Sequence, residues 1–132
     1  MMQRPEYPTT YGDQIGEWLS DQPWSHFATI TAPYPLTLTS ARRLAQRTID
    51  RWKSITSADA KMVYAIERNT DGMGHHIHAL VHFTAEVDPD MFARMVDGQG
   101  RIDLQRYDPK QAGARYITKA VTERRDNWDT IH

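Results

Sequence analysis

Two strand-like segments on either side of a short turn restrict the fold of this chain more than any other feature. Residues 61–69 (KMVYAIERN) and 75–84 (HHIHALVHFT) are rich in the β-branched and aromatic residues that favour strands. Residues 70–74 between them contain Asp-Gly, a dipeptide typical of tight hairpin turns. The sequence therefore predicts a β-hairpin. Because a two-stranded hairpin is only marginally stable alone, further strands or helices must pack against it.

Two further segments have the alternating pattern of strands. Residues 24–31 (WSHFATIT) combine this alternation with β-branched and aromatic side chains. The two prolines within residues 32–35 end this segment, because proline cannot continue a strand ladder. Residues 101–107 alternate apolar Ile102 and Leu104 with polar neighbours, which predicts a fourth strand.

Helical signals occur between these strands. The longest predicted helix has Thr39 or Ser40 as its N-cap and ends near Ile55. The spacing of one helical face predicts its buried side, formed by Leu44, Thr48, Ile49 and Trp52. The last predicted helix follows Asp108 as a cap, with Pro109 at its first position. Besides the longest helix, the predicted helical segments are residues 12–20, 89–96 and 111–125.

The order of these elements predicts the class of fold. After the short helix expected at residues 12–20, a strand, helix, strand, strand, helix, strand and helix follow one another within 132 residues. Adjacent strands joined by short turns favour an antiparallel sheet with helices packed on it. We therefore expect one α+β domain over residues 1–132, with a central antiparallel sheet of about four to five strands. Residues 1–11 are expected to form an irregular N-terminal arm.

Composition excludes several classes of function. The chain has no cysteine, and therefore no disulfide, thiolate metal site or cysteine nucleophile. It has no run of about 20 apolar residues that could span a membrane, and its first residues lack a signal-peptide core, so we expect a cytoplasmic protein. A net charge of −1 does not favour general electrostatic attraction to nucleic acid. Any contact with DNA or RNA would therefore be local.

The second hairpin strand carries the first candidate site. Side chains alternate between the faces of a strand, so His76 and His78 point to one face and Ile77 points to the other. Glu67 lies on the preceding strand, across the turn from this pair. Two imidazoles and one carboxylate can form a three-ligand metal site with open positions. The alternative is that all three are ordinary half-exposed strand residues.

The last predicted helix carries the second candidate site. Tyr116 and Lys119 are three residues apart, and therefore share one helical face. A phenol with its usual pKa of about 10 is a poor nucleophile unless it is activated. A metal ion could polarise a phosphoryl group under attack, and a lysine could supply positive charge beside it. The alternative for Tyr116 is a half-buried aromatic residue that packs the helix.

Three motifs in this order resemble the HUH endonucleases of the rolling-circle replication initiator type, which are the small nicking domains of plasmid and viral Rep proteins. The motifs are residues 27–31 (FATIT), 76–78 (HIH) and 116–119 (YITK). The first matches an aromatic-x-Thr-hydrophobic-Thr strand, the second His-hydrophobic-His and the third Tyr-x-x-Lys on a helix. The resemblance spans about residues 24–121 and implies a ferredoxin-like, RRM-like sheet.

The resemblance implies a function for each matched residue. His76, His78 and Glu67 would bind a divalent ion, Mn²⁺ or Mg²⁺. Tyr116 would attack a phosphodiester of single-stranded DNA at a replication origin, possibly within a hairpin. The products would be a 5′-phosphotyrosine link and a free 3′-hydroxyl, and the reverse attack would rejoin the strand. Lys119 would orient the phosphate, and a host helicase and polymerase would act with the protein.

Candidate DNA contacts are a separate expectation. They are Arg43, Arg47, Arg51, Arg115 and His26. The first three recur every four residues, so they form one stripe on a helix that could follow a phosphate backbone. The alternative is a solvated helix face. Tyr34 and Trp24 could stack on unpaired bases, although packing in the core is the simpler role for Trp24.

Several other functions stay open. A single-tyrosine transposase of the same superfamily has nearly the same chemistry, and a mobilisation relaxase is a more distant relative. A non-haem iron oxygenase also uses two histidines and a carboxylate, but it leaves Tyr116 and Lys119 without a role. A nucleic-acid-binding module that has lost activity is the non-enzymatic alternative. Tyr107 is expected on a strand and is not counted as a second nucleophile.

Overall fold

The computed structural model describes residues 19, 22–56, 59–86, 88, 101–108, 110, 112–123 and 127–131. The expected N-terminal arm, the helix expected at 89–96 and nearly all of the helix expected at 12–20 lie outside these residues. The elements in chain order are β1 (His26–Thr31), α2 (Leu38–Thr56), β2 (Ala60–Arg68), β3 (His75–Phe83), β4 (Arg101–Arg106), α4 (Ala112–Glu123) and β5 (Asn127–Ile131).

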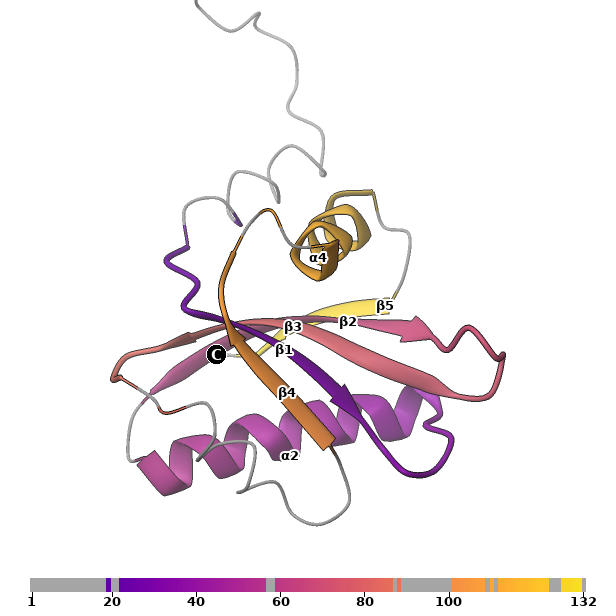
Figure 1. The fold of residues 1–132 in the computed structure, drawn as a ribbon. Helices are drawn as coiled ribbons and strands as arrows, with labels where there is room; N and C mark the ends of the chain where they lie inside the picture. The colour runs from indigo at the N-terminus through magenta and orange to yellow at the C-terminus, as the bar shows by residue number, and fades with distance from the viewer. Residues whose placement is uncertain are drawn as a thin grey trace, which may run out of the picture.

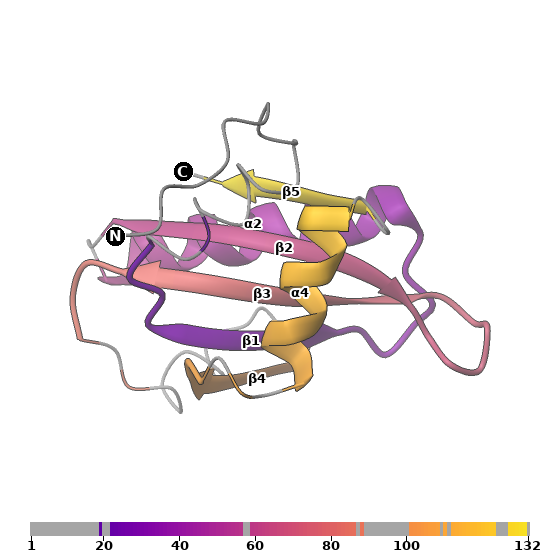
Figure 2. The same cartoon turned by 90° about the horizontal axis from the view of Figure 1, so that it is seen from above.

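The strands form one antiparallel sheet in the order β4-β1-β3-β2-β5. Helix α2 covers one face of the sheet and α4 crosses the other (Figures 1 and 2). This arrangement confirms the α+β fold expected from the sequence. Within the described residues, no helix is both long enough and apolar enough to cross a bilayer.

Strand β5 is the element that the sequence patterns did not identify. The last helix was expected to continue to about residue 125, with no strand after it, whereas α4 ends at Glu123 and residues 127–131 (NWDTI) pair with β2. Polar residues outnumber apolar ones in this short segment, so the sequence gives only a weak strand pattern. The strand pairs with β2, and its Trp128 and Ile131 pack against the cores under α4 and α2.

The expected hairpin is confirmed and its register is clear. Glu67 of β2 lies opposite His76 of β3, and Ala65 lies opposite His78. The turn between the strands includes Gly72 and Gly74, which have φ angles of 76° and 84°. These left-handed conformations suit glycine because it has no Cβ. The hairpin therefore places the HIH segment beside the end of β2.

Helix α2 begins two to three residues earlier than the sequence indicated. Thr37 is the N-cap, since its Oγ1 accepts a hydrogen bond from the backbone N–H of Ser40 at 3.0 Å. Ser40 Oγ in turn accepts the backbone N–H of Thr37 at 2.8 Å, as in a capping box. The expected buried side is confirmed, because the following side chains are all at most 5% exposed: Leu44, Thr48, Ile49 and Trp52.

The two faces of the sheet belong to two apolar cores. The core under α2 includes Ile77, and the core under α4 includes Leu80 together with Ile117 and Ala120 of the helix. Because neighbouring residues of a strand face opposite sides, His76 and His78 lie on the α4 face. The sheet therefore presents both histidines on the side that carries Tyr116.

Candidate metal centre

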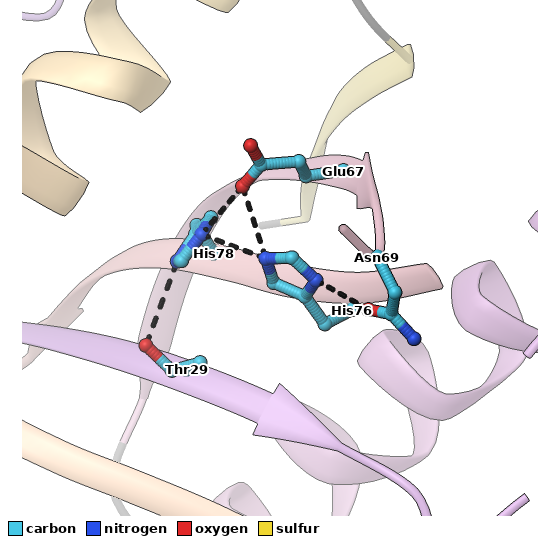
Figure 3. Close-up of polar contacts among 5 residues, drawn as sticks. All are labelled: Thr29, Glu67, Asn69, His76 and His78. Atoms are coloured by element: carbon cyan, nitrogen blue, oxygen red, sulfur yellow. Dashed lines mark hydrogen bonds and ion pairs between the residues drawn. The ribbon is translucent and has the colours of Figure 1, made fainter. Parts of the chain in front are cut away.

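Three donor atoms from β2 and β3 converge on the α4 face of the sheet (Figure 3). Glu67 Oε2 lies 2.9 Å from His76 Nε2 and 3.0 Å from His78 Nε2. The two Nε2 atoms are 3.1 Å apart. All three side chains are half-buried, and together they form a cluster that could hold a metal ion. The expectation that Glu67 joins the two histidines across the turn is thus confirmed.

One carboxylate oxygen and two imidazole nitrogens that lie within 2.9–3.1 Å of one another can act as ligands of a single cation. Three protein ligands leave further coordination positions for water or substrate oxygens.

A residue outside the expected site fixes the tautomer of His76. Asn69 Nδ2 donates to the carbonyl of Met73 at 2.9 Å, so its Oδ1 faces His76 Nδ1 at 2.6 Å. The proton of the neutral imidazole therefore lies on Nδ1, and Nε2 presents a lone pair to the cluster. This lone pair faces the carboxylate of Glu67, and a cation between the two would relieve their repulsion.

Sequence reasoning missed Asn69, although it follows β2 directly. The only signal was its position next to the Asp-Gly turn, and no motif contains it. Thr29, in contrast, belongs to the FATIT segment, and its Oγ1 lies 3.5 Å from His78 Nδ1. The Nδ1 atoms of both histidines thus face side-chain oxygens, and their Nε2 atoms face the cluster (Figure 3).

Two aromatic rings enclose His78. Phe27 stacks on its imidazole with ring centroids 5.7 Å apart, and Tyr116 meets it edge-on at 5.4 Å. Burial lowers the pKa of His78, the neighbouring His76 lowers it further, and Glu67 opposes both effects. The lowered pKa favours the neutral form of His78, which is the form that binds a metal.

Helix α4 holds Tyr116 over the cluster. Ile117 and Ala120 are 0% and 1% exposed and pack the helix onto the sheet. Tyr116 is half-buried at the flank of this contact, beside His78. Lys119 follows one turn later and is exposed. The structure thus brings Tyr116 to His78 and leaves Lys119 exposed to solvent on the same helix.

The candidate DNA contacts are not gathered at this centre. Arg43, Arg47 and Arg51 are exposed, but α2 lies on the opposite face of the sheet (Figure 1). Arg115 is exposed on α4, next to Tyr116. His26 does not fit a DNA contact, because it is 6% exposed, packs edge-on against a phenylalanine ring and hydrogen-bonds a serine hydroxyl.

Comparison with known proteins gives a likeness of fold. No protein-family model matches the chain, and no curated protein does. Among solved structures, the chain is similar to the hypothetical protein ORF119 from Sulfolobus islandicus rod-shaped virus 1, with a TM-score of 0.52 and 14% sequence identity. The match covers 83% of this chain and 90% of that chain. At this identity the likeness extends to the fold alone.

Proposed function

We propose that this protein is a metal-dependent nicking and joining enzyme for single-stranded DNA, of the HUH type that initiates rolling-circle replication of a plasmid or virus. One observation carries the proposal, namely the contact between the ring of Tyr116 and the ring of His78. The contact supports the proposal because it brings the ring of Tyr116 next to one of the three side chains that could hold a cation.

The ion in this proposal is Mn²⁺ or Mg²⁺, which are the metals that the resemblance to the HUH endonucleases implies. Glu67, His76 and His78 would hold it through one oxygen and two nitrogens, with the Nδ1 atom of each histidine directed to an oxygen of Asn69 or Thr29. When bound, such an ion polarises the phosphoryl group and stabilises the negative charge that develops on its oxygens. With three protein ligands, the ion would keep open positions for those oxygens.

The residues of α4 would perform the transfer itself. The phenolic oxygen of Tyr116 would form a bond to phosphorus, and the bond from phosphorus to the 3′ oxygen would break. The phenolic proton would pass to solvent, and the departing oxygen would take up a proton as a free 3′-hydroxyl. Lys119 would bring positive charge to the phosphate from the exposed side of the helix.

This reaction exchanges one phosphodiester for another, so it needs no external energy source. The tyrosyl ester keeps the phosphodiester for the reverse attack, which would rejoin the strand. A host helicase would unwind the duplex that supplies the single strand. A host polymerase would extend the 3′-hydroxyl inside the cell that replicates the DNA.

A covalent-trapping experiment tests the proposal. The protein is mixed with Mn²⁺ and a pool of single-stranded oligonucleotides labelled at the 3′ end, because the enzyme would retain the downstream fragment. A protease-sensitive band of low mobility on a denaturing gel would report the adduct. We expect Tyr116→Phe, His78→Ala and added EDTA each to abolish it.

Tyr107→Phe is the matched control. Tyr107 lies just after β4 and packs against the same apolar core as Tyr116, so its loss is a similar perturbation. The adduct should persist in Tyr107→Phe. An adduct that survives Tyr116→Phe would assign the nucleophile to another residue. Reversible DNA binding without an adduct, across pools that include hairpins, would instead identify a binding module.

A further inference from the structure

A pocket lies on the α2 side of the sheet, on the face opposite the candidate metal centre. It has a volume of about 400 Å³, within the range of small-molecule sites. The described residues that line it come from the β1–α2 connection and the first turns of α2: Tyr34, Ser40, Arg43, Gln46 and Arg47. Among these residues, the polar groups and the aromatic ring of Tyr34 suit a ligand that has both a charged part and a flat ring.

Two guanidinium groups give the pocket positive charge. Arg43 and Arg47 are four residues apart on α2, so their side chains lie on the same face, one turn from each other. Among the described residues, no carboxylate forms an ion pair with Arg43. Guanidinium groups bind phosphate through two parallel hydrogen bonds, so this pair favours a phosphorylated ligand.

The remaining groups favour a nucleoside over a simple anion. Tyr34 is 43% exposed, although large aromatic residues tend to be buried in a domain of this size. It stands between two prolines, which limit the motion of the connection that carries it. Gln46 donates its amide N–H to Asp50 at 2.9 Å, which leaves its amide oxygen as an acceptor.

The pocket is close to the hairpin that carries the metal ligands. Pro35, next to Tyr34, packs against Gly74, and the Nδ1 atom of His75 lies 2.8 Å from the carbonyl oxygen of Leu36. The connection that carries Tyr34 therefore contacts the hairpin at Gly74 and at His75, the residue before His76.

From this combination we infer that the pocket binds a nucleoside phosphate, with the base against Tyr34 and the phosphate on Arg43 and Arg47. The ligand is either one nucleotide of a single strand or a free mononucleotide. An acidic peptide would pair with the arginines but leave the aromatic ring unused. Binding here needs neither a metal ion nor Tyr116, so it stands apart from the proposed function.

Fluorescence anisotropy in EDTA tests this inference without strand cleavage. The probe is a labelled oligothymidylate of about 16 nucleotides. We expect Tyr34→Ala and Arg43→Ala each to weaken binding by about tenfold, and Tyr34→Phe, which keeps the ring, to bind as the wild type does. Loss of Arg43 should also lower the salt slope of binding by about one.

Arg51→Ala is the matched control, because Arg51 lies on the same helix but does not line the pocket. It should weaken binding by less than about threefold, since Arg51 would make no direct contact with the bound ligand and its charge acts only through screened solvent. Competition with thymidine monophosphate separates the two sources of ligand. Displacement by the mononucleotide at concentrations similar to those of the oligomer indicates a free nucleotide, and displacement by oligomers alone indicates a strand.

Three results would overturn the inference. Equal losses in Arg43→Ala and Arg51→Ala would mean a general basic stripe instead of a pocket. Unchanged affinity in Tyr34→Ala would show that no base stacks on the ring of Tyr34. A wild-type protein that binds neither the oligomer nor the mononucleotide in EDTA would exclude the site. Tyr34 and Arg43 are exposed, so these variants should keep the wild-type unfolding curve.

Discussion

The Nδ1 atom of His76 lies 2.6 Å from the Oδ1 atom of Asn69, and this hydrogen bond decides which imidazole nitrogen faces the candidate metal centre. The Asn69 amide is itself oriented by its bond to the carbonyl of Met73 in the hairpin turn. The hairpin turn therefore helps to orient His76 in the candidate metal centre through the side chain of Asn69. Outer hydrogen bonds of this kind orient a ligand and raise its basicity.

Substitution of Asn69 is expected to weaken metal binding while the ligands stay in place. In Asn69→Ala, His76 loses the acceptor for its Nδ1 proton, and the affinity for Mn²⁺ should fall by about 10- to 100-fold. Asn69→Asp keeps an acceptor oxygen and should bind at least as tightly as Asn69→Ala. Titration calorimetry measures both. Equal affinities in wild type and Asn69→Ala would show that the bond has no influence on the centre.

Glu67→Gln tests the carboxylate of the cluster. The amide keeps the size of the side chain but removes the charge that faces both Nε2 atoms at 2.9 and 3.0 Å. We expect the affinity for Mn²⁺ to fall at least about tenfold, because a hard cation prefers a charged oxygen. Glu86→Gln, at an exposed residue after β3, is the control and should bind as the wild type does. A loss shared by both variants would argue against a specific ligand.

Ile117→Ala should loosen α4 from the sheet. Ile117 is 0% exposed in the core under the helix, so its truncation leaves a cavity and should cost about 2–5 kcal/mol of unfolding free energy. Urea unfolding measures this loss. Arg115→Ala, on the exposed side of the same helix, should change stability by less than about 0.5 kcal/mol. A similar cost in both variants would mean that α4 is not held through this contact.

The two glycines of the hairpin turn should respond differently to alanine. Both have positive φ, which costs an alanine about 1–2 kcal/mol. A Cβ on Gly72 would meet open space, whereas one on Gly74 would lie 2.7 Å from Pro35 Cα. Because backbone cannot move aside cheaply, Gly74→Ala should unfold at clearly lower urea concentration than Gly72→Ala. The reverse order would contradict the packing of Pro35 on the turn.

His26 should make stability depend on pH. Burial lowers its pKa, and the charge of Arg106 lowers it further. The folded state then binds the proton less readily than the unfolded state, so this contribution is fully present above pH of about 6.5 and is lost as pH falls through the lowered pKa.

Urea unfolding between about pH 8 and pH 5 measures this slope, which for one site cannot exceed about 1.4 kcal/mol per pH unit. In His26→Gln the slope over this range should be smaller than in the wild type. If wild type and variant have parallel profiles, His26 titrates alike in both states.

Local patterns in the sequence determined the hairpin, the buried side of α2 and the three residues of the candidate metal centre. Strand alternation put His76 and His78 on one face, and the short turn put Glu67 across from them. These features depend on the period of a strand and on the length of a turn, and both are local properties. The N-cap of α2 was misplaced because Thr37, Thr39 and Ser40 all have the side chains of caps.

Tertiary structure decided which elements face one another. No local pattern tells which face of a sheet a helix covers, so only the packed structure places Tyr116 beside His78 and the arginines of α2 on the opposite side. Strand β5 forms because β2 offers a free edge, and Asn69 reaches His76 because the turn folds it inward. The alternation of side chains along a strand or helix follows from neighbouring residues alone. Contacts between distant elements form only when helices pack on both faces of the same sheet.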